Sequence, residues 1–458
     1  MKHLGDRVED LKIAYIGGGS RGWAWGLMSD LSQSKQISGT VYLYDIDFQA
    51  ALDNEIIGNK SGDNFNYKAV EQISDALPSA DFVIISILPG TFDEMESDVH
   101  TPEKYGIYQS VGDSTGPGGL VRALRTIPMY VEIPEAIKEY CPNAWVINYT
   151  NPMALCVATL YKVFPKIKAF GCCHEVFGTQ KILCQMLDEM GIIKNADRHE
   201  LSTMPVGINH FTWLTSAYYK NIDLFPLYKD FVKKHKEEGI TRADKNWLNS
   251  FFGTAEIVKF ELFEQYSVIA AAGDRHLAEF CPGNWFLASP DVTHQWKFNL
   301  TPVSWRKEEL RKRKEKSRKL VSGEIDFEQK ATGEEGVNQI CALLGLSDIV
   351  TNVNMPNVGQ LSNIPLGTVV ETNAVFSANS VTPVNSGAIP ENVYSIMAPA
   401  VYNQNNIING MFEKDKNLLF NAFISDRLTD RLSLSDAKEL FNTMLKNTKK
   451  YLPEWIIK

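Results

Sequence analysis

The residues best suited to chemistry form the run Gly171-Cys172-Cys173-His174-Glu175-Val176, which follows an apolar segment that predicts a strand end. Asn209-His210 lies downstream. A thiolate and an imidazole, such as those of Cys173 and His210, can hold a Zn-, Fe- or Mn-class ion and leave positions for substrate oxygens. A free cysteine is more often a small buried hydrophobe, and no CxxC or HExxH motif supports the pair. The spacing by itself therefore leaves metal binding open.

A second polar group, Asp274-Arg275-His276, is followed closely by Glu279. An aspartate beside a cation can stay ionised and act as a base. The alternative is a surface ion-pair cluster with no part in catalysis.

The segment 12–22 predicts a dinucleotide-binding turn. An apolar strand leads into Gly17-Gly18-Gly19-Ser20-Arg21-Gly22, which matches GxGxxG and opens a helical stretch. Such glycines permit a tight turn, close approach of backbone to a pyrophosphate, and close helix–strand packing. Asp45 ends the next strand and can accept hydrogen bonds from ribose hydroxyls, which favours NAD over NADP; otherwise it is a strand-end turn residue. A thiolate metal site and a nicotinamide site on one chain indicate redox chemistry on a bound hydroxyl.

Alternating strands and helices must position these groups. Strands are predicted at 12–16, 40–44, 81–88, 144–148 and 167–170, and helices at 23–31, 127–140 and 179–189. This alternation predicts an α/β fold with a doubly wound parallel sheet in residues 1–195, the NAD-binding domain. In 196–458 the alternation fades. There, the charge run 306–319 predicts a solvated helix with i,i+4 pairs rather than an anion-binding patch, and 373–390 predicts a loop.

Composition excludes several classes of protein. The chain has 458 residues, 44% apolar content and a net charge of −9, which argues against nucleic-acid binding. No apolar run is long enough to span a membrane, and the first residues lack a signal-peptide pattern. Seven irregularly spaced cysteines form a poor disulfide framework, so we expect a reducing, cytoplasmic setting.

Taken in order, five short motifs resemble one family. They are Gly17-Gly18-Gly19-Ser20, Asn148-Tyr149-Thr150-Asn151-Pro152, Cys173-His174-Glu175-Val176, Gly207-Ile208-Asn209-His210 and Gly273-Asp274-Arg275-His276. The ordered set is similar to the NAD- and manganese-dependent glycoside hydrolases of family 4. Segments 93–119 and 352–357 most resemble the family's α-galacturonidases.

This resemblance implies a Rossmann domain of the lactate/malate dehydrogenase type joined to an α+β domain at 196–458 that carries substrate, metal and oligomer contacts. It also implies a homodimer or homotetramer. In the family's reaction NAD⁺ takes hydride from C3 of the sugar, a base removes the C2 proton, the glycosidic oxygen leaves, water adds, and NADH returns the hydride. This route departs from the usual two-carboxylate scheme.

Carried over by motif, the resemblance gives each residue a role. Cys173 and His210 would bind Mn²⁺, and Asn151 would hold the sugar hydroxyls. His174 occupies the acid position, where Glu175 or a water could share the role, and Asp274 occupies the base position. We expect Arg275, beside that base, to read the galacturonate carboxylate, with ion pairing to Asp274 as the alternative.

The expected activity is cleavage of a small oligogalacturonide or another α-glycoside. An α-glucosidase of the same family is the nearest alternative, since it shares Cys-His-Glu-Val. A 2-hydroxyacid dehydrogenase and a non-catalytic NAD sensor remain as other classes, and net turnover of NADH would separate the dehydrogenase from a glycosidase.

Overall fold

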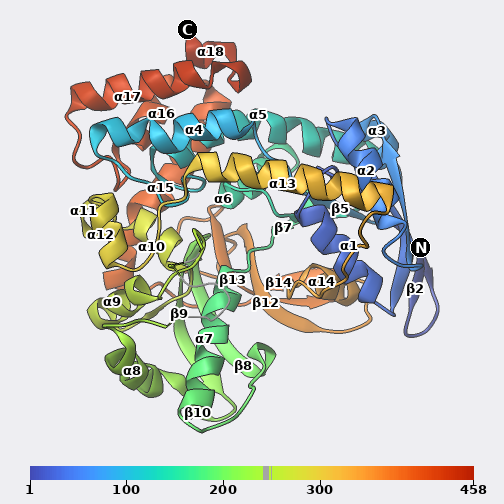
Figure 1. Cartoon of the computed structure of the whole chain (residues 1–458), viewed down its shortest axis with the longest axis horizontal. Helices are drawn as coiled ribbons and strands as arrows, with labels where there is room; N and C mark the ends of the chain where they lie inside the picture. Colours follow the sequence, from blue (N-terminus) through green and yellow to red (C-terminus); the bar gives the residue numbers. More distant parts are fainter. Residues whose placement is uncertain (241–246, 249) are drawn as a thin grey trace.

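A computed structural model describes residues 1–240, 247–248 and 250–458. Its main feature is a ten-stranded sheet in the order β14-β13-β12-β7-β6-β5-β2-β3-β4, with β1 paired to β2 (Figure 1). The strands of this sheet are β1 (Lys2–His3), β2 (Val8–Ile16), β3 (Ile37–Tyr44), β4 (Phe65–Val70), β5 (Phe82–Ile85), β6 (Trp145–Asn148), β7 (Lys168–Gly171), β12 (Ile349–Pro356), β13 (Val369–Ser377) and β14 (Ser380–Pro383).

Strands β4, β3, β2, β5, β6 and β7 are parallel neighbours. Their order along the sheet, 3-2-1-4-5-6 in chain order, is that of dinucleotide-binding domains. The central strand β5 is buried at every position, as its all-apolar run predicts for a strand covered on both faces. The predicted doubly wound parallel sheet is therefore confirmed.

The antiparallel strands β12, β13 and β14 extend this sheet beyond β7. The predicted loop at 373–390 is thus wrong in its first part, because β13 continues to Ser377 and β14 follows it. Polar residues along those strands hid the pattern, since pairing depends on neighbours distant in sequence. The main sheet also takes strands from beyond residue 195, so the division there stays a prediction.

A second, four-stranded sheet has the order β10-β9-β11, with β8 paired to β9. Its strands are β8 (Leu201–Ile208), β9 (Phe211–Tyr219), β10 (Ile222–Asp223) and β11 (Ile269–Ala270). Strands β8 and β9 form a hairpin in which Ile208 pairs with Phe211. The two residues between them, Asn209 and His210, therefore form a tight turn, and this turn belongs to the site described below.

Helices cover the sheets and build the end of the molecule that carries the C-terminus (Figure 1). Those of the first half are α1 (Trp23–Gln33), α2 (Phe48–Gly58), α3 (Ile73–Ala76), α4 (Phe92–His100), η1 (Pro102–Tyr105), α5 (Gly116–Tyr140), α6 (Met153–Val163), α7 (Glu175–Glu189), η2 (Arg198–Glu200) and α8 (Leu224–His235). The others are α9 (Ile257–Tyr266), α10 (Asp274–Phe280), α11 (Gly283–Phe286), α12 (Pro290–Gln295), α13 (Val303–Ser322), α14 (Gly336–Leu343), α15 (Glu391–Glu413), α16 (Lys416–Ile424), α17 (Leu434–Asn447), η3 (Lys449–Tyr451) and α18 (Glu454–Ile457). Among the described residues, no helix is both long and apolar enough for a bilayer span.

The charge run forms helix α13, as predicted, and its exposed face carries ion pairs. Most of these are i,i+3 pairs, as between Arg311 and Glu308 or Arg318 and Glu315, rather than the expected i,i+4 spacing. Such exposed pairs contribute little to stability.

The turn after β2 has no room for side chains. Gly17 has a φ of 92°, and a Cβ there would fall on the backbone carbonyl oxygen of Ser86. Asn54 of α2 fixes the turn, because its side-chain amide donates to the carbonyl oxygens of Gly18 and Ser20 at 2.7 and 3.1 Å. This arrangement brings the β2 turn against the end of β5.

We expect Gly17→Ala to destabilise the fold and to abolish dinucleotide binding, because the new methyl group would push β5 away from the turn. The loss should be on the order of 2 kcal/mol or more in the free energy of unfolding. Thermal or urea unfolding measures it. Gly178→Ala is the matched control, since its Cβ would meet nothing within 4 Å in helix α7. That change should be neutral or slightly stabilising, and equal stability of the two variants would contradict the packing argument.

Candidate active site

The carboxyl ends of four adjacent parallel strands deliver the candidate residues to one edge of the sheet. The β2 turn, Ser86 after β5, Asn151 after β6 and the Cys172–His174 segment after β7 all lie there. Ligands of open α/β sheets bind at this edge, where the strand order reverses. Here the reversal falls between β2 and β5.

One compact group at this edge consists of Asp113, His210 and His276. The ligand-type atoms of these three residues all lie within 4.8 Å of one another. Asp113 comes from the loop before α5, His210 from the β8–β9 turn and His276 from α10. The rings of His210 and His276 are tilted against each other with centroids 3.8 Å apart. A carboxylate and two imidazoles suit a borderline divalent ion.

The hydrogen bonds of His210 leave one ring nitrogen available. The Ser114 hydroxyl donates to Oδ1 of Asp113 at 2.8 Å and lies 2.9 Å from Nδ1 of His210. Because the hydroxyl has a single proton, Nδ1 must be the donor in that contact, which leaves the lone pair on Nε2. Burial, followed by the neighbouring His276, lowers the pKa of His210 to about 3, so its imidazole is neutral, the form that binds metals.

Two carboxylates stay ionised in this buried place. Burial alone would raise the pKa of Asp113, but Arg122 and the hydrogen bond from the Ser114 hydroxyl help to hold it below its usual value. Burial also opposes ionisation of Glu175, yet the nearby histidines lower the pKa of Glu175 to about 2. The first residue of α7, Glu175, places Oε1 at 3.8 Å from Nε2 of His276, and Oε2 accepts a hydrogen bond from the Gly273 amide at 2.6 Å.

His174, the predicted acid, approaches the same oxygen of Glu175. Its Nε2 is 3.8 Å from Oε1 of Glu175, and its Nδ1 is 3.0 Å from Oε1 of Glu334. The hydrogen bond to Glu334 raises the pKa of His174 to about 9, although burial opposes the shift. The imidazole therefore carries a proton at neutral pH and loses it only as the pH rises toward 9.

Cys173 lies near the group of three but is not part of it. Burial, followed by the charge of Glu371, raises the pKa of its thiol well above the usual range. Glu371 is itself buried and accepts hydrogen bonds from Asn209 and Asn352 at 3.2 and 2.7 Å. The thiol of Cys172 points elsewhere, donating to Oε1 of Gln339 at 2.9 Å. The metal role of Cys173 stays a prediction.

Asn151 lies beside Asp113, and its role as a sugar ligand stays a prediction. Its side-chain amide donates to Oδ2 of Asp113 at 3.4 Å, and Nε of Arg122 donates to its backbone carbonyl at 3.1 Å. Its buried Oδ1 has no hydrogen-bond partner. An unpaired buried acceptor of this kind is costly unless a ligand donates to it, so it suits a sugar hydroxyl.

Asp274 is not brought to this group. Its side chain is fully buried, and its oxygens accept hydrogen bonds from the backbone amides of Val258 and Lys259 at 3.2 and 3.1 Å. Burial and the adjacent Glu256 raise its pKa. The carboxylate thus caps helix α9, and this placement gives the predicted base role no geometric support.

Two arginines interact with each other and with the charge of Asp113. The guanidinium of Arg275 donates to the Ser110 carbonyl and to the Thr301 hydroxyl, and it lies over the Phe252 ring at 5.0 Å. Arg306 of α13 lies over the same ring at 5.4 Å. Burial lowers the pKa of Arg306, and Asp113 is its strongest charged neighbour. Arg275 and Arg306 are therefore two cations at one side of the site.

The sequence did not indicate that Asp113, Glu334 and Arg306 belong to the site. It also did not indicate that Glu175 is an ionised carboxylate beside the histidines. Asp113 lies in the segment 93–119 that resembles the α-galacturonidases, but nothing in the local pattern assigns it to His210, which lies almost a hundred residues later. Arg306 belongs to a run of similar charges, so sequence could not separate it from its solvated neighbours.

The dinucleotide turn has the features that the sequence predicts. A Cβ at Gly18 or Gly19 would come within 2.8 Å of Leu43 Cα or 2.7 Å of Ala50 Cβ. Helix α1 has neither a side-chain cap nor an acid in its first turn, so its first amides can face phosphate oxygens. Asp45 accepts hydrogen bonds from the amides of Gly19 and Asp47, both at 2.9 Å. Each oxygen keeps a second lone pair for a ribose hydroxyl.

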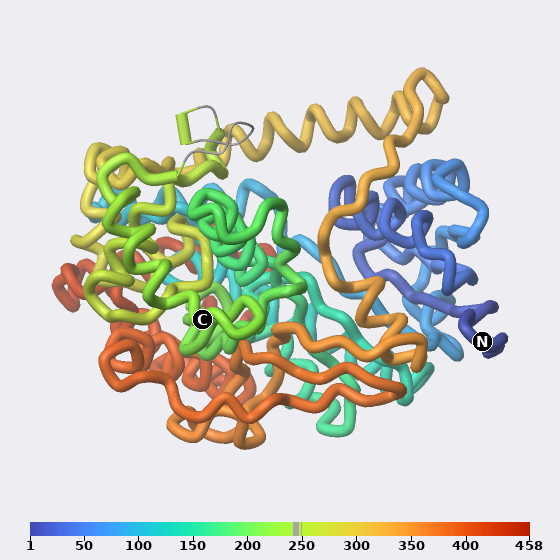
Figure 2. The backbone as a smooth tube through the Cα atoms, turned by 90° about the horizontal axis from the view of Figure 1, so that it is seen from below, coloured from blue at the N-terminus to red at the C-terminus, as the bar shows by residue number. Residues whose placement is uncertain are grey.

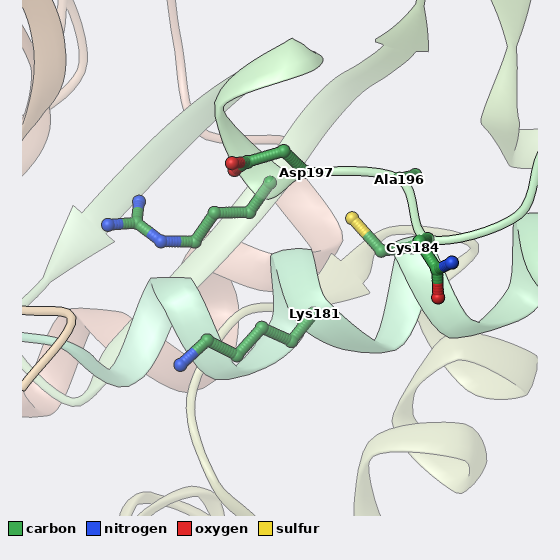
Figure 3. A pocket seen from close by; sticks show the side chains of 6 residues that line it. Lys181, Cys184, Ala196 and Asp197 are labelled. Atoms are coloured by element: carbon green, nitrogen blue, oxygen red, sulfur yellow. The ribbon is translucent and has the colours of Figure 1, made fainter. Parts of the chain in front are cut away.

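A separate surface cavity of about 440 Å³ lies beside α7 (Figure 3). Its lining residues are Lys181, Cys184, Asn195, Ala196, Asp197 and Arg198. None of them belongs to the group of Asp113, His210 and His276, and burial raises the pKa of the Cys184 thiol to about 11, which makes it unreactive.

Two family models match consecutive parts of the chain. The model of the family 4 glycosyl hydrolases matches residues 12–189, and the model of their C-terminal domain matches residues 205–429. The chain belongs to glycoside hydrolase family 4. The motifs that suggested this family are those that converge at the sheet edge.

Other family 4 members are similar along the whole chain. The "Alpha-galacturonidase" of Thermoanaerobacterium saccharolyticum is 60% identical, with full coverage of both chains. The crystal structure of "putative glucosidase lplD from bacillus subtilis" superposes with a TM-score of 0.92 at 52% identity and covers 96% of this chain and 100% of that one. A 6-phospho-alpha-glucosidase from gut microorganisms, solved in complex with NAD and Mn²⁺, shares the fold with a TM-score of 0.79 at 18% identity, covering 97% and 99%.

We expect Cys173→Ser to weaken Mn²⁺ binding by about ten-fold or more, because a hydroxyl replaces a thiolate ligand. Isothermal titration of the chain with Mn²⁺ measures the effect. Cys172→Ser is the matched control, since that thiol faces Gln339, and it should leave the affinity unchanged. Unchanged Mn²⁺ affinity in Cys173→Ser would leave the metal to Asp113, His210 and His276.

Proposed function

We propose that this family 4 enzyme is an α-galacturonidase that cleaves small oligogalacturonides. The supporting observation is the 60% identity over the full length to a protein named "Alpha-galacturonidase". Arg275 and Arg306 agree with this substrate, since a sugar carboxylate needs cationic donors in the pocket. A neutral α-glucoside offers no group that would use them, and this disfavours the α-glucosidase alternative.

The residues of the site fit the family's two cofactors. The glycine turn leaves backbone room for a pyrophosphate, and Asp45 at the end of β3 suits the ribose of NAD. Asp113, His210 and His276 form an oxygen and nitrogen donor set, and the buried Nδ1 of His276 has no partner. They would hold the manganese ion, with Cys173 as the further ligand that the family resemblance assigns. When bound, NAD⁺ supplies reversible hydride acceptance at C3, and the metal polarises the neighbouring sugar oxygens.

The chain's own residues divide the proton transfers between them. His174, protonated at neutral pH because of its hydrogen bond to Glu334, would give its proton to the leaving glycosidic oxygen. Glu175 is the ionised carboxylate that does not belong to the group of Asp113, His210 and His276, so we assign the C2 proton to its Oε1 in place of Asp274. Asn151 Oδ1 orients a sugar hydroxyl next to Asp113.

The deciding experiment is hydrolysis of di-galacturonate in D₂O with NAD⁺, Mn²⁺ and a thiol reductant. We expect cleavage without net NADH and with deuterium at C2 of the product. Glu175→Gln should lower deuterium incorporation by about 100-fold or more, because it removes the proton acceptor. Asp274→Asn is the paired variant. It should lower the unfolding temperature, while the folded enzyme still incorporates deuterium at C2 of the sugar.

Three outcomes would contradict this assignment. Loss of exchange in a folded Asp274→Asn enzyme would return the base role to Asp274. Hydrolysis without C2 exchange would exclude the elimination route. Net NADH formation would favour the dehydrogenase reading.

The proposed contact between the two arginines and the substrate carboxylate leads to a separate prediction. We expect Arg306→Met and Arg275→Met to lower kcat/KM for galacturonides more than for neutral α-galactosides. The difference should correspond to roughly 2 kcal/mol, the contribution of a lost charge-assisted hydrogen bond. The ratio of kcat/KM for the two substrates measures it. Arg311→Met is the control, because Arg311 pairs with Glu308 on the exposed face of α13. Equal losses on both substrates would assign the two arginines a structural role.

We further propose a reducing, cytoplasmic location and a homodimer or homotetramer. All seven cysteines are free and buried, which supports the location. The oligomeric state rests on the family resemblance, and light scattering of the purified chain tests it.

A further inference from the structure

Helix α13 crosses from the later part of the chain onto the first Rossmann helices, as both backbone views show (Figures 1 and 2). It packs against α2 and α4. Nζ of Lys60 donates to the carbonyl oxygens of Leu320 and Val321 at 3.3 and 3.0 Å, which fixes its end. The segment that follows is bound to α1, where the Ser29 hydroxyl donates to the Lys330 carbonyl at 2.7 Å. The helix therefore has a fixed position over the dinucleotide turn.

Arg313 of this helix reaches the turn itself. A Cβ built on Gly22 would lie 2.9 Å from Nη1 of Arg313 and 3.8 Å from its Cζ. Gly22 is the N-cap residue of α1, whose first turn carries no capping side chain and no acid. The guanidinium thus lies next to the amides that would face the phosphates.

Most of the other cations on α13 have carboxylate partners, whereas no ion pair is formed by the Arg313 side chain within the described residues. Arg311, Lys312 and Arg318 each pair with a glutamate three residues earlier. In the part of the chain that the structure describes, Arg313 makes no ion pair and no hydrogen bond. Arg21, the other arginine at the turn, is already 3.7 Å from Asp53. Arg313 is therefore the uncompensated cation at this position.

Helix geometry links this arginine to the substrate end of the site. Arg306 and Arg313 are seven residues apart, which is close to two turns, so they project from the same face with an axial separation of about 10 Å. Arg306 lies over the Phe252 ring together with Arg275, while Arg313 lies beside Gly22. One face of α13 thus carries one cation near Arg275 and another at the dinucleotide turn.

We propose that Arg313 binds the diphosphate of the dinucleotide, so that α13 contributes a cofactor ligand from outside the Rossmann fold. This inference rests on the NAD dependence proposed above. A guanidinium matches two phosphate oxygens at once, and it supplies charge where helix α1 supplies amides.

The test measures binding rather than activity. Isothermal titration of the wild type, Arg313→Gln and Arg311→Gln compares the affinities for NAD⁺, ADP-ribose and adenosine, without substrate. We expect Arg313→Gln to lower the affinity for NAD⁺ and ADP-ribose by about ten-fold or more, and to leave the affinity for adenosine unchanged. Arg313→Lys should recover part of the loss, because it keeps the charge but not the two-point geometry.

Because Arg313 is exposed, its variants and the wild type should have the same unfolding temperature without ligand. Equal temperatures would exclude misfolding as the cause of a lost affinity. Equal NAD⁺ affinity of Arg313→Gln and Arg311→Gln would overturn this inference and leave the proposed function intact. An equal loss for adenosine and ADP-ribose would also overturn it, since it would indicate a role away from the phosphates. A wild type that does not bind NAD⁺ would overturn both proposals.

Discussion

Two ionised carboxylates in a buried place, Asp113 and Glu175, constrain the whole site. Desolvation alone would keep both of them protonated. Arg122 and the Ser114 hydroxyl reverse that tendency for Asp113, and protonated His174 and the Gly273 amide reverse it for Glu175. Separate parts of the chain must therefore meet at one point. A buried charge without these partners would cost several kcal/mol, so the arrangement is one that the fold has to maintain.

The parallel sheet provides the meeting point. Strands β2, β5, β6 and β7 end at one edge, and the loops after them carry the glycine turn, Asn151 and His174. The β8–β9 turn then brings His210 to the same edge, with the histidine at a φ of 65°, a conformation uncommon for residues other than glycine. Residues in uncommon backbone conformations cluster at functional sites, where the surrounding packing holds them in place.

The division of roles around Glu175 follows from its two neighbours. His174 is kept protonated by Glu334, whereas burial lowers the pKa of His276. One carboxylate oxygen thus lies 3.8 Å from each of two imidazoles whose pKa values are shifted in opposite directions. Helix α13 adds the cations of Arg306 and Arg313 to this edge from outside the Rossmann fold. Its exposed face carries ion pairs instead.

Local periodicity and short motifs were enough to predict the parallel sheet, the dinucleotide turn and, among the residues that meet at the site, Asn151, His174 and His210. Strand and helix patterns such as β5 and α1 are written in neighbouring residues, and Gly17 is required by its own turn. The tertiary structure decided which polar groups are partners. It joined Asp113 to His210, separated Cys172 from Cys173, and turned Asp274 away to cap α9. It also selected Arg306 and Arg313 from a run of similar charges. Contacts of this kind, and the shifts in pKa that burial brings, depend on residues far apart in the chain, so no local pattern could reveal them.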